Sequence, residues 1–402
     1  MKVTLINPPS PYLTNDAAYP PMGLLYLAAS LIIQGHEVKV VDLTGGIDWK
    51  KEIMKQHADL FGITCVTPNF SIVSEIAEVL NNTIVIGGPH PTFLPEETLE
   101  KVSCNTIVIG EGEVAIQELT RDLERGCLES IYRGGMVPVE AIPKPARHLV
   151  DLHRYRPGGE DATTIYTSRG CSYNCNFCSK ITGRIYREFP ISRVVEEIEE
   201  VISMGFRKIV FGDDNIIIDP MRVRRLLRAI KPLNIEFRLN QDARCVREDL
   251  IALAASSGCT EISYGIEHGS QKILDLMNKH TTVEANKDVI LATKKHGLTA
   301  KAYFIVNFPG EDDETVNETL KFAAEVMPDR WLLSSFAPLP GCDVFRNPEK
   351  YGITWLSKNW EDYYLVGKGG GFKPCFTTKT LSVEKQIYLH NMMYRGLKEI
   401  LG

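Results

Sequence analysis

Short apolar segments alternate with amphipathic ones along the first 125 residues. Strands buried on both faces of a parallel sheet have apolar runs with little alternation between apolar and polar positions. Such runs occur at 3–6, 37–42, 60–66, 83–87 and 106–109. Segments with helical periodicity lie between them, at 22–35, 48–57, 71–82 and 113–123. This alternation predicts a doubly wound, Rossmann-like α/β domain over residues 1–125.

A second α/β run follows a proline-rich stretch at 126–162, where the periodic pattern lapses and a linker is expected. Apolar segments recur at 163–168, 207–212, 235–240, 261–266, 301–306 and 331–336. Residues 191–204 place an apolar stripe along one face of a helix. Six β/α units over residues 163–340 predict a partial TIM-like barrel, short of the eight units that close the usual barrel. The open side would admit a large substrate.

The last segment, 341–402, differs from both runs and is predicted to be a small α-rich extension. Four aromatic residues, Trp355, Trp360, Tyr363 and Tyr364, precede a glycine-rich loop at 368–371. We expect these aromatics and the mobile loop to cover a substrate.

Charge and hydropathy narrow the classes of protein. The net charge of −6 argues against nucleic-acid binding by bulk electrostatics. No apolar stretch reaches the ~18 residues that span a bilayer, and the start lacks the apolar core of a signal peptide. We therefore expect a cytoplasmic protein without a transmembrane segment. In that compartment its ten cysteines would serve metal chemistry, catalysis or packing rather than disulfides.

Three of the cysteines form the strongest chemical signal. Cys171, Cys175 and Cys178 have the spacing C-x3-C-x2-C directly after the first strand of the second run. Thiolates favour iron–sulfur clusters, zinc or copper(I). A structural zinc site needs four protein ligands, so zinc would require a remote cysteine such as Cys259, Cys342 or Cys375. A 4Fe-4S cluster with three cysteines keeps one iron open for another ligand.

Polar residues also follow the later strands of this run, where α/β folds place their chemistry. Phe211-Gly212-Asp213-Asp214-Asn215 ends the second strand, and Arg244 follows the third. Gly265-Ile266-Glu267-His268-Gly269-Ser270 ends the fourth, and Phe308-Pro309-Gly310-Glu311 follows the fifth. Each also has a structural interpretation: a solvated turn or helix cap, a surface arginine, a packed imidazole, a tight turn.

The cysteine triad, its place after the first strand and these later segments resemble the radical S-adenosylmethionine (SAM) superfamily. The resemblance implies that the open iron chelates SAM and that an electron cleaves SAM to a 5'-deoxyadenosyl radical. It also implies SAM contacts from Phe177, Asp213, Asp214, Asn215, Arg244, Glu267 and Ser270. His268 departs from the serine usual at its position, which makes it a candidate acid–base group. Cys375 is a second candidate for catalysis.

The first domain carries segments of its own at the predicted strand ends. They are Pro20-Pro21-Met22-Gly23-Leu24-Leu25-Tyr26-Leu27-Ala28, Gly87-Gly88-Pro89-His90-Pro91-Thr92 and Gly110-Glu111-Gly112-Glu113. Together they resemble the cobalamin-binding domain that precedes the radical SAM domain in one subfamily. The resemblance implies cobalamin contacts from Asn7, Pro8, Pro9, Gly23, Thr64, Thr67, Gly87, Gly88, Pro89, His90, Glu111, Gly112 and Glu113.

One departure concerns the lower cobalt ligand. The Asp-x-His-x-x-Gly pattern of cobalamin domains is absent, and Asn7-Pro8-Pro9-Ser10-Pro11 stands in its place. No imidazole is therefore expected below the cobalt. His90 lies in a different loop, so we expect it to contact the nucleotide tail or to be structural.

These resemblances imply a cobalamin-dependent radical SAM methyltransferase that acts on an unactivated carbon of an organic substrate. Such an enzyme takes electrons from an external donor such as flavodoxin or ferredoxin. Two alternatives stay open. One is another radical outcome on the same scaffold, namely cyclisation, ring contraction, oxidation or carbon–carbon coupling. The other is a non-catalytic cobalamin- or metal-binding sensor.

Overall fold

The computed structural model describes residues 1–402 apart from the side chain of Cys245, and the chain forms two compact units. Unit 1 comprises Met1–Asp161 together with Lys180–Gly183 and Asn359–Tyr363. Unit 2 comprises Ala162–Ser179, Arg184–Lys358 and Tyr364–Gly402. The chain therefore contributes two short later segments to the unit that its N-terminal part builds.

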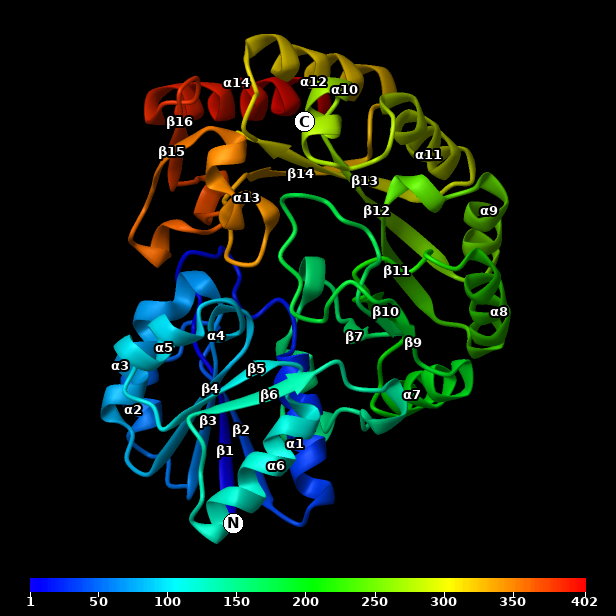
Figure 1. Cartoon of the computed structure of the whole chain (residues 1–402). Coiled ribbons are helices and arrows are strands. Elements are labelled where there is room, and N and C mark those ends of the chain that lie inside the picture. Colours follow the sequence, from blue (N-terminus) through cyan, green and yellow to red (C-terminus); the bar gives the residue numbers. More distant parts are fainter. The chain divides into compact units, whose positions relative to one another are not determined.

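Unit 1 is a doubly wound parallel sheet, as the sequence predicts. Its strand order is β2-β1-β3-β4-β5-β6 in the described chain. The strands are β1 (Lys2–Asn7), β2 (Glu37–Asp42), β3 (Leu60–Thr64), β4 (Thr83–Gly87), β5 (Thr106–Gly110) and β6 (Ile131–Gly135). The helices are α1 (Met22–Ile33), α2 (Trp49–Ile53), α3 (Phe70–Val79), α4 (Pro89–Phe93), α5 (Pro95–Lys101) and α6 (Gly112–Arg125). Helices α1 and α6 pack together on one face, with α2 and α3 on the other (Figure 1).

The stretch expected as a linker contributes to this sheet. β6 lies within 126–162 and pairs in parallel with β5, and the rest of the stretch up to Asp161 belongs to unit 1. The sequence concealed the strand because Ile131–Gly135 reads Ile-Tyr-Arg-Gly-Gly, and an edge strand needs little apolar character. A fully buried strand such as β3, with Cys65 at its end in the core, was easier to recognise.

Unit 2 contains the partial barrel. Its parallel sheet has the order β14-β13-β12-β11-β10-β7 in the described chain. The strands are β7 (Thr163–Ile165), β10 (Lys208–Phe211), β11 (Glu236–Gln241), β12 (Cys259–Glu267), β13 (Thr299–Val306) and β14 (Arg330–Ser335). The helices α7 (Ile191–Ser203), α8 (Pro220–Ile230), α9 (Glu248–Ser256), α11 (Val283–Lys295) and α12 (Asp313–Val326) cover its outer face (Figure 1). A short helix, α10 (Gln271–Leu276), follows β12.

The remaining elements form the C-terminal extension. They are α13 (Asp343–Arg346), the antiparallel pair β15 (Ile353–Leu356) and β16 (Phe376–Thr378), and α14 (Val383–Leu401), which packs on α12. Cys375, considered for an exposed catalytic role, is only 1% exposed. It precedes β16, where its backbone carbonyl accepts the amide hydrogen of Ser357, and a catalytic role for its thiol stays a prediction. None of the described helices is both long and apolar enough to cross a membrane.

Candidate active site and cofactor-binding edges

The cysteine loop is clamped at its base. β8 (Ser168–Arg169) pairs antiparallel with β9 (Arg187–Glu188), so the chain between them leaves and returns at one point. Cys171 and Cys175 are buried and Cys178 is half-buried, and all nine cysteines with described side chains are free thiols. Among the described residues, no three His, Cys, Asp or Glu side chains converge on a single metal ion.

Cys342 was considered as a remote fourth ligand of a zinc site. It lies near enough to Cys178 for the charge of that residue to affect the pKa of the Cys342 thiol. Burial, with a smaller contribution from Cys178, raises the pKa of Cys342 to about 11. Its sulfur also accepts the amide hydrogen of Phe345 at 3.3 Å. Cys342 therefore fits the helix cap it forms better than a zinc site.

Cys175 lies beside two cations. The guanidinium of Arg244 is 3.7 Å from its sulfur and lies over the ring of Tyr173, 3.5 Å from the centroid. Burial raises the pKa of the Cys175 thiol, and the charges of Lys279 and Arg244 oppose that shift. Positive charge at this position stabilises a thiolate, the form that binds iron.

The two cations belong to a buried chain of alternating charge. Asp242 accepts from Arg244 at 2.8 Å and pairs with Lys279 at 2.9 Å, and Lys279 pairs with Glu267 at 2.8 Å. Burial acts to raise the pKa of Asp242, but Lys279 and Arg244 outweigh it and lower that pKa to about 2. Burial likewise acts to lower the pKa of Lys279, and the two carboxylates reverse this and raise it. Asp242 and Lys279 therefore stay charged near neutral pH.

The sequence indicated Arg244 and Glu267 but missed Lys279. This lysine lies after α10 in a polar stretch without periodicity, which resembles a solvated loop. One signal was Gly265: a Cβ there would collide with the Glu267 carboxylate and lie 3.1 Å from the Lys279 ammonium. The ion pair therefore passes close to the backbone at Gly265. Glu267 itself follows a register shift in β12 and has a φ of 63°.

Asp213 anchors the clamp rather than facing open space. Its carboxylate accepts from the amide of Thr167 at 3.1 Å, from the Thr167 hydroxyl at 2.9 Å and from the hydroxyl of Ser168. Burial raises the pKa of Asp213 in spite of these bonds. Buried Arg222 completes the arrangement by donating to the carbonyls of Thr167 and Phe189. Asp213 was predicted to contact SAM together with Asp214 and Asn215. In the structure its carboxylate instead holds the start of the cysteine loop.

Asn215 has the character of a ligand-binding group. It is 1% exposed, and neither the nitrogen nor the oxygen of its carboxamide has a hydrogen-bond partner. A buried amide is normally paired, because an unpaired one costs free energy. A bound molecule with both a donor and an acceptor, such as the amino-acid part of SAM, would satisfy it. Its neighbour Asp214 is exposed.

Two other residues predicted for SAM lie in the same unit. The half-buried ring of Phe177 is 5.9 Å from the ammonium of Lys279, which brings it next to the charge chain. Ser270 is buried at the start of α10, where its amide donates to the ring of His268 at 3.0 Å. Phe177 thus joins the charged cluster, whereas Ser270 belongs to the network around His268.

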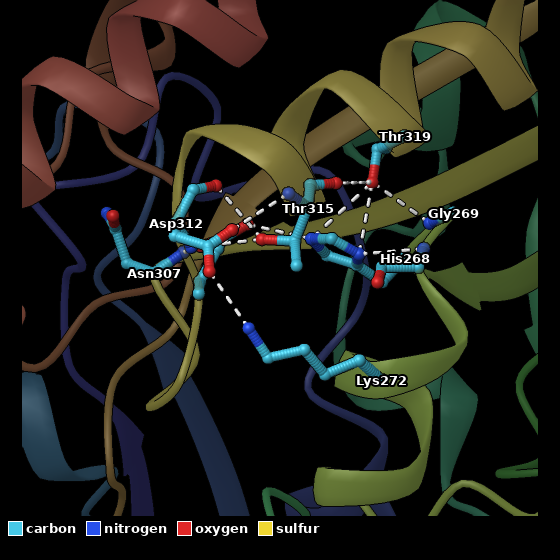
Figure 2. Close-up of polar contacts among 9 residues, drawn as sticks. His268, Gly269, Lys272, Asn307, Asp312, Thr315 and Thr319 are labelled. Carbon is cyan, nitrogen blue, oxygen red and sulfur yellow. Dashed lines mark hydrogen bonds and ion pairs between the residues drawn. The ribbon is translucent and has the colours of Figure 1, made fainter.

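His268 is held in a closed network, and Figure 2 shows it between the turn after β12 and the first turns of α12. The Ser270 amide donates to Nδ1, so Nε2 carries the proton that is shared with Glu311 at 2.7 Å. The other Glu311 oxygen accepts the amide hydrogen of Asn307. His268 is 0% exposed and both of its nitrogens are engaged. The geometry therefore argues against the acid–base role considered for His268 and indicates that it joins two turns.

In unit 1 the predicted cobalamin residues surround the carboxyl edge of the sheet. The direction of strand order changes between β1 and β3, and ligands of such sheets bind at that point. Asn7 to Pro9 follow β1, and Thr64 and Thr67 follow β3. A hydrogen bond of 3.0 Å from Asn69 to Ser10 joins the two loops. A Cβ atom at Gly23 would meet nothing within 4 Å, and one at Gly87 would meet only the Val108 side chain, at 3.8 Å. A bulky ligand could therefore approach both.

Other residues of that set have structural contacts. Gly88 has a φ of 108°, and a Cβ there would lie 2.9 Å from the carbonyl of Cys65, so its loop packs on protein. Pro89 begins α4 directly after it. Glu111 accepts the amide hydrogen of Val137 at 2.7 Å, a Cβ on Gly112 would strike Leu27, and Glu113 is buried in the first turn of α6.

His90 is completely buried between Phe70, 4.3 Å between ring centroids, and Trp360, at 5.3 Å. Burial lowers the pKa of His90 to about 4, so the ring is neutral near neutral pH. Of the two roles considered for His90, this geometry fits the structural one. Trp360 comes from the C-terminal extension, whose aromatic residues the sequence predicted to cover a substrate.

Comparison with known proteins agrees with this division of the chain. Residues 165–323 match the model of the radical SAM superfamily, and residues 14–120 match that of the B12 binding domain. An uncharacterized methyltransferase of Pyrococcus horikoshii is 32% identical over 91% of this chain and 87% of its own length. The chain belongs to the cobalamin-dependent radical SAM enzymes.

Two other known proteins are similar to this chain over most of its length, one in sequence and one in structure. The anaerobic magnesium-protoporphyrin IX monomethyl ester cyclase of Rubrivivax gelatinosus is 28% identical over 82% of this chain and 66% of its own length. The radical SAM methyltransferase TsrM of Kitasatospora setae, solved with cobalamin and a [4Fe-4S] cluster, has the same fold. Its TM-score is 0.76 at 18% identity, covering 100% of this chain and 89% of that one.

The cofactors of this cobalamin-dependent radical SAM enzyme are a 4Fe-4S cluster, SAM and cobalamin. The residues present fit them. Three free thiols share one clamped loop, an unpaired carboxamide lies in the same unit, and unit 1 has open glycine backbone at its sheet edge.

Proposed function

We propose that this enzyme transfers a methyl group to an unactivated carbon of an organic substrate. One observation carries the proposal: a relative named as a methyltransferase is similar along nearly the whole chain, through both the cobalamin-binding and the radical SAM parts. When bound, the cluster with SAM supplies a 5'-deoxyadenosyl radical, and cobalamin carries the methyl group.

In this proposal Cys171, Cys175 and Cys178 hold the cluster. The carboxamide of Asn215 binds the amino-acid part of SAM, because it is buried with both polar atoms unpaired. Arg244 and Lys279 bring positive charge toward the Cys175 sulfur and toward the carboxylate of SAM, while Asp242 and Glu267 hold those cations in place. These residues position the reactants, and their burial excludes water.

Unit 1 binds cobalamin at its sheet edge, at the loops after β1 and β3. Gly23 and Gly87 leave room for the cofactor, and Asn7 to Pro9 and Thr67 line the approach. These positions would offer no imidazole to the cobalt of a bound cobalamin, because Asn7-Pro8-Pro9 stands where a histidine would be and His90 is enclosed by aromatic rings.

A second candidate is ring formation, favoured by the similarity to the magnesium-protoporphyrin IX monomethyl ester cyclase. Methyl transfer ranks first because the methyltransferase-named relative has higher identity and a larger covered share of both chains.

Product analysis separates the two. Protein reconstituted with iron and sulfide under anaerobic conditions is incubated with SAM, hydroxocobalamin, a reductant and cell extract from a deletion strain. Methyl transfer should yield S-adenosylhomocysteine and 5'-deoxyadenosine in equal amounts, with label from [methyl-13C]SAM in the product. Formation of 5'-deoxyadenosine alone, with an unlabelled product, would favour cyclisation. Absence of both nucleosides would contradict a radical SAM reaction.

We also propose a cytoplasmic location and flavodoxin or ferredoxin as the electron donor. None of the nine cysteines with described side chains is in a disulfide, which suits a reducing compartment. Cell fractionation tests the location, and replacement of dithionite by reduced flavodoxin or ferredoxin in the SAM cleavage assay tests the donor.

A further inference from the structure

A short segment of the C-terminal extension belongs to the cobalamin-binding unit. Asn359–Tyr363, here the Trp360 strap, lies in unit 1, while Lys358 and Tyr364 on either side belong to unit 2. The strap includes the 3-10 helix η9 (Trp360–Asp362), which packs against α3 and against η1 (Thr67–Asn69). Its contacts are therefore made with the loop after β3, at the ligand-binding edge of the sheet.

The side chain of Trp360 is held from several directions. Its indole nitrogen donates to Glu97 on α5 at 3.0 Å, and the same carboxylate pairs with Lys101 at 2.5 Å. Its ring packs against the hydrophobic core of unit 1 and meets His90 edge-on. The ring of buried Tyr363 also packs against Trp360, with 5.0 Å between the two ring centroids. The bond between Trp360 and Glu97 joins residues 263 positions apart in the sequence.

His90 links the strap to both loops of that edge. It lies in α4, directly after β4, and its amide donates to the Cys65 carbonyl after β3. Its Nδ1 is 3.4 Å from the Thr67 hydroxyl. Its Nε2 is buried without a hydrogen-bond partner. Such a group reduces stability, so packing alone does not account for a histidine here.

We infer that the Trp360 strap is a working part of the cobalamin site, in which Trp360 acts as a positioning residue. Through His90 and Glu97 it holds the loops after β3 and β4 in the geometry that receives the cofactor. Cobalamin binding by unit 1 therefore requires a segment encoded far after Asp161, where the N-terminal part of that unit ends. This inference rests on the cobalamin dependence of the proposed function.

The test measures hydroxocobalamin binding by the full-length protein, from absorbance after gel filtration and from titration. Trp360→Ala should raise the Kd about tenfold or more. Trp360→Phe, which keeps a ring but loses the donor to Glu97, should have an intermediate effect. Trp355→Ala is the matched control, because Trp355 lies in the same extension but is 47% exposed on β15 of unit 2. Its Kd should stay within about twofold of the wild-type value.

Iron content and SAM binding, measured on the same samples, should be unchanged in all three variants. Binding is measured well below each variant's melting temperature, so that reduced stability alone does not alter the Kd. If Trp360→Ala fails to fold, Trp360→Phe decides. Wild-type affinity in a folded Trp360 variant would overturn the inference alone. Failure of the wild-type protein to bind hydroxocobalamin would overturn cobalamin dependence and the role of the strap with it.

Discussion

At the scale of single residues, Lys279 shows how burial gives an ordinary side chain a specific task. An exposed lysine paired with a carboxylate contributes little to stability. Lys279 is instead almost fully buried between Asp242 and Glu267, next to the cation that contacts Cys175. Each charge in this chain is tolerated only because its neighbours are present.

We therefore predict that Lys279→Met lowers the free energy of unfolding by about 3 kcal/mol, since it leaves two buried carboxylates without their shared cation. The double variant with Glu267→Gln should recover part of the loss, with a coupling energy of at least about 1 kcal/mol. Urea unfolding of the four proteins in the double-mutant cycle measures both values. Additive effects of the two substitutions would contradict the prediction.

At the scale of elements, two buried polar networks fix the loops at the barrel edge. Asp213 and Arg222 hold the chain where β7 leads into the cysteine loop. His268 and Glu311 join the turn after β12 to the turn after β13. The second network holds Glu267 and Asn307 at φ values of 63° and 70°, a region that non-glycine residues rarely adopt. Backbone strain of this kind persists where the surroundings enforce it.

His268→Ser tests the second network. The change leaves one oxygen of the buried Glu311 carboxylate without a donor, so we expect a loss of about 2–3 kcal/mol in the free energy of unfolding. It should also weaken SAM binding, because Glu267 is held less firmly beside Lys279. Urea unfolding and SAM titration are the measurements.

Lys272→Ala is the control for this substitution. Lys272, at the start of α10, pairs with Asp312 close to the His268 network (Figure 2), but its side chain is 56% exposed. The substitution should therefore lower the free energy of unfolding by less than about 0.5 kcal/mol. Equal losses in the two variants would show that His268 has no special role.

At the scale of the whole molecule, the cofactors are divided between the two units. The cysteine triad lies in unit 2, whereas every residue predicted for cobalamin lies in unit 1. The chain joins the units repeatedly, since unit 1 takes Lys180–Gly183 and the Trp360 strap from later parts of the sequence.

This division predicts that cobalamin binding survives loss of the cluster. The triple variant Cys171→Ala, Cys175→Ala, Cys178→Ala should contain no cluster iron and cleave no SAM. It should still bind hydroxocobalamin with a Kd within about twofold of the wild-type value, because unit 1 is unaltered. Iron analysis and cobalamin titration on the same preparation give both values, and a joint loss would show that the two sites depend on each other.

Much of this organisation follows from the sequence itself. Apolar runs and helical periodicity predicted both parallel sheets, because a buried strand needs apolar side chains at nearly every position. The spacing of Cys171, Cys175 and Cys178 predicts a cluster loop, because ligands so close in sequence can reach one centre from a single loop. The absence of a histidine after β1 is likewise visible without a structure.

Only the tertiary structure showed which polar residues are hydrogen-bonded within the protein and which are left without a partner. Asp213, Asn215 and His268 are equally conspicuous in the sequence, yet Asp213 and His268 are fully hydrogen-bonded to protein and Asn215 has no partner. Lys279 and Trp360 gain their roles from contacts far away in the sequence. Burial and pairing depend on where distant segments meet, and a local pattern contains no record of that.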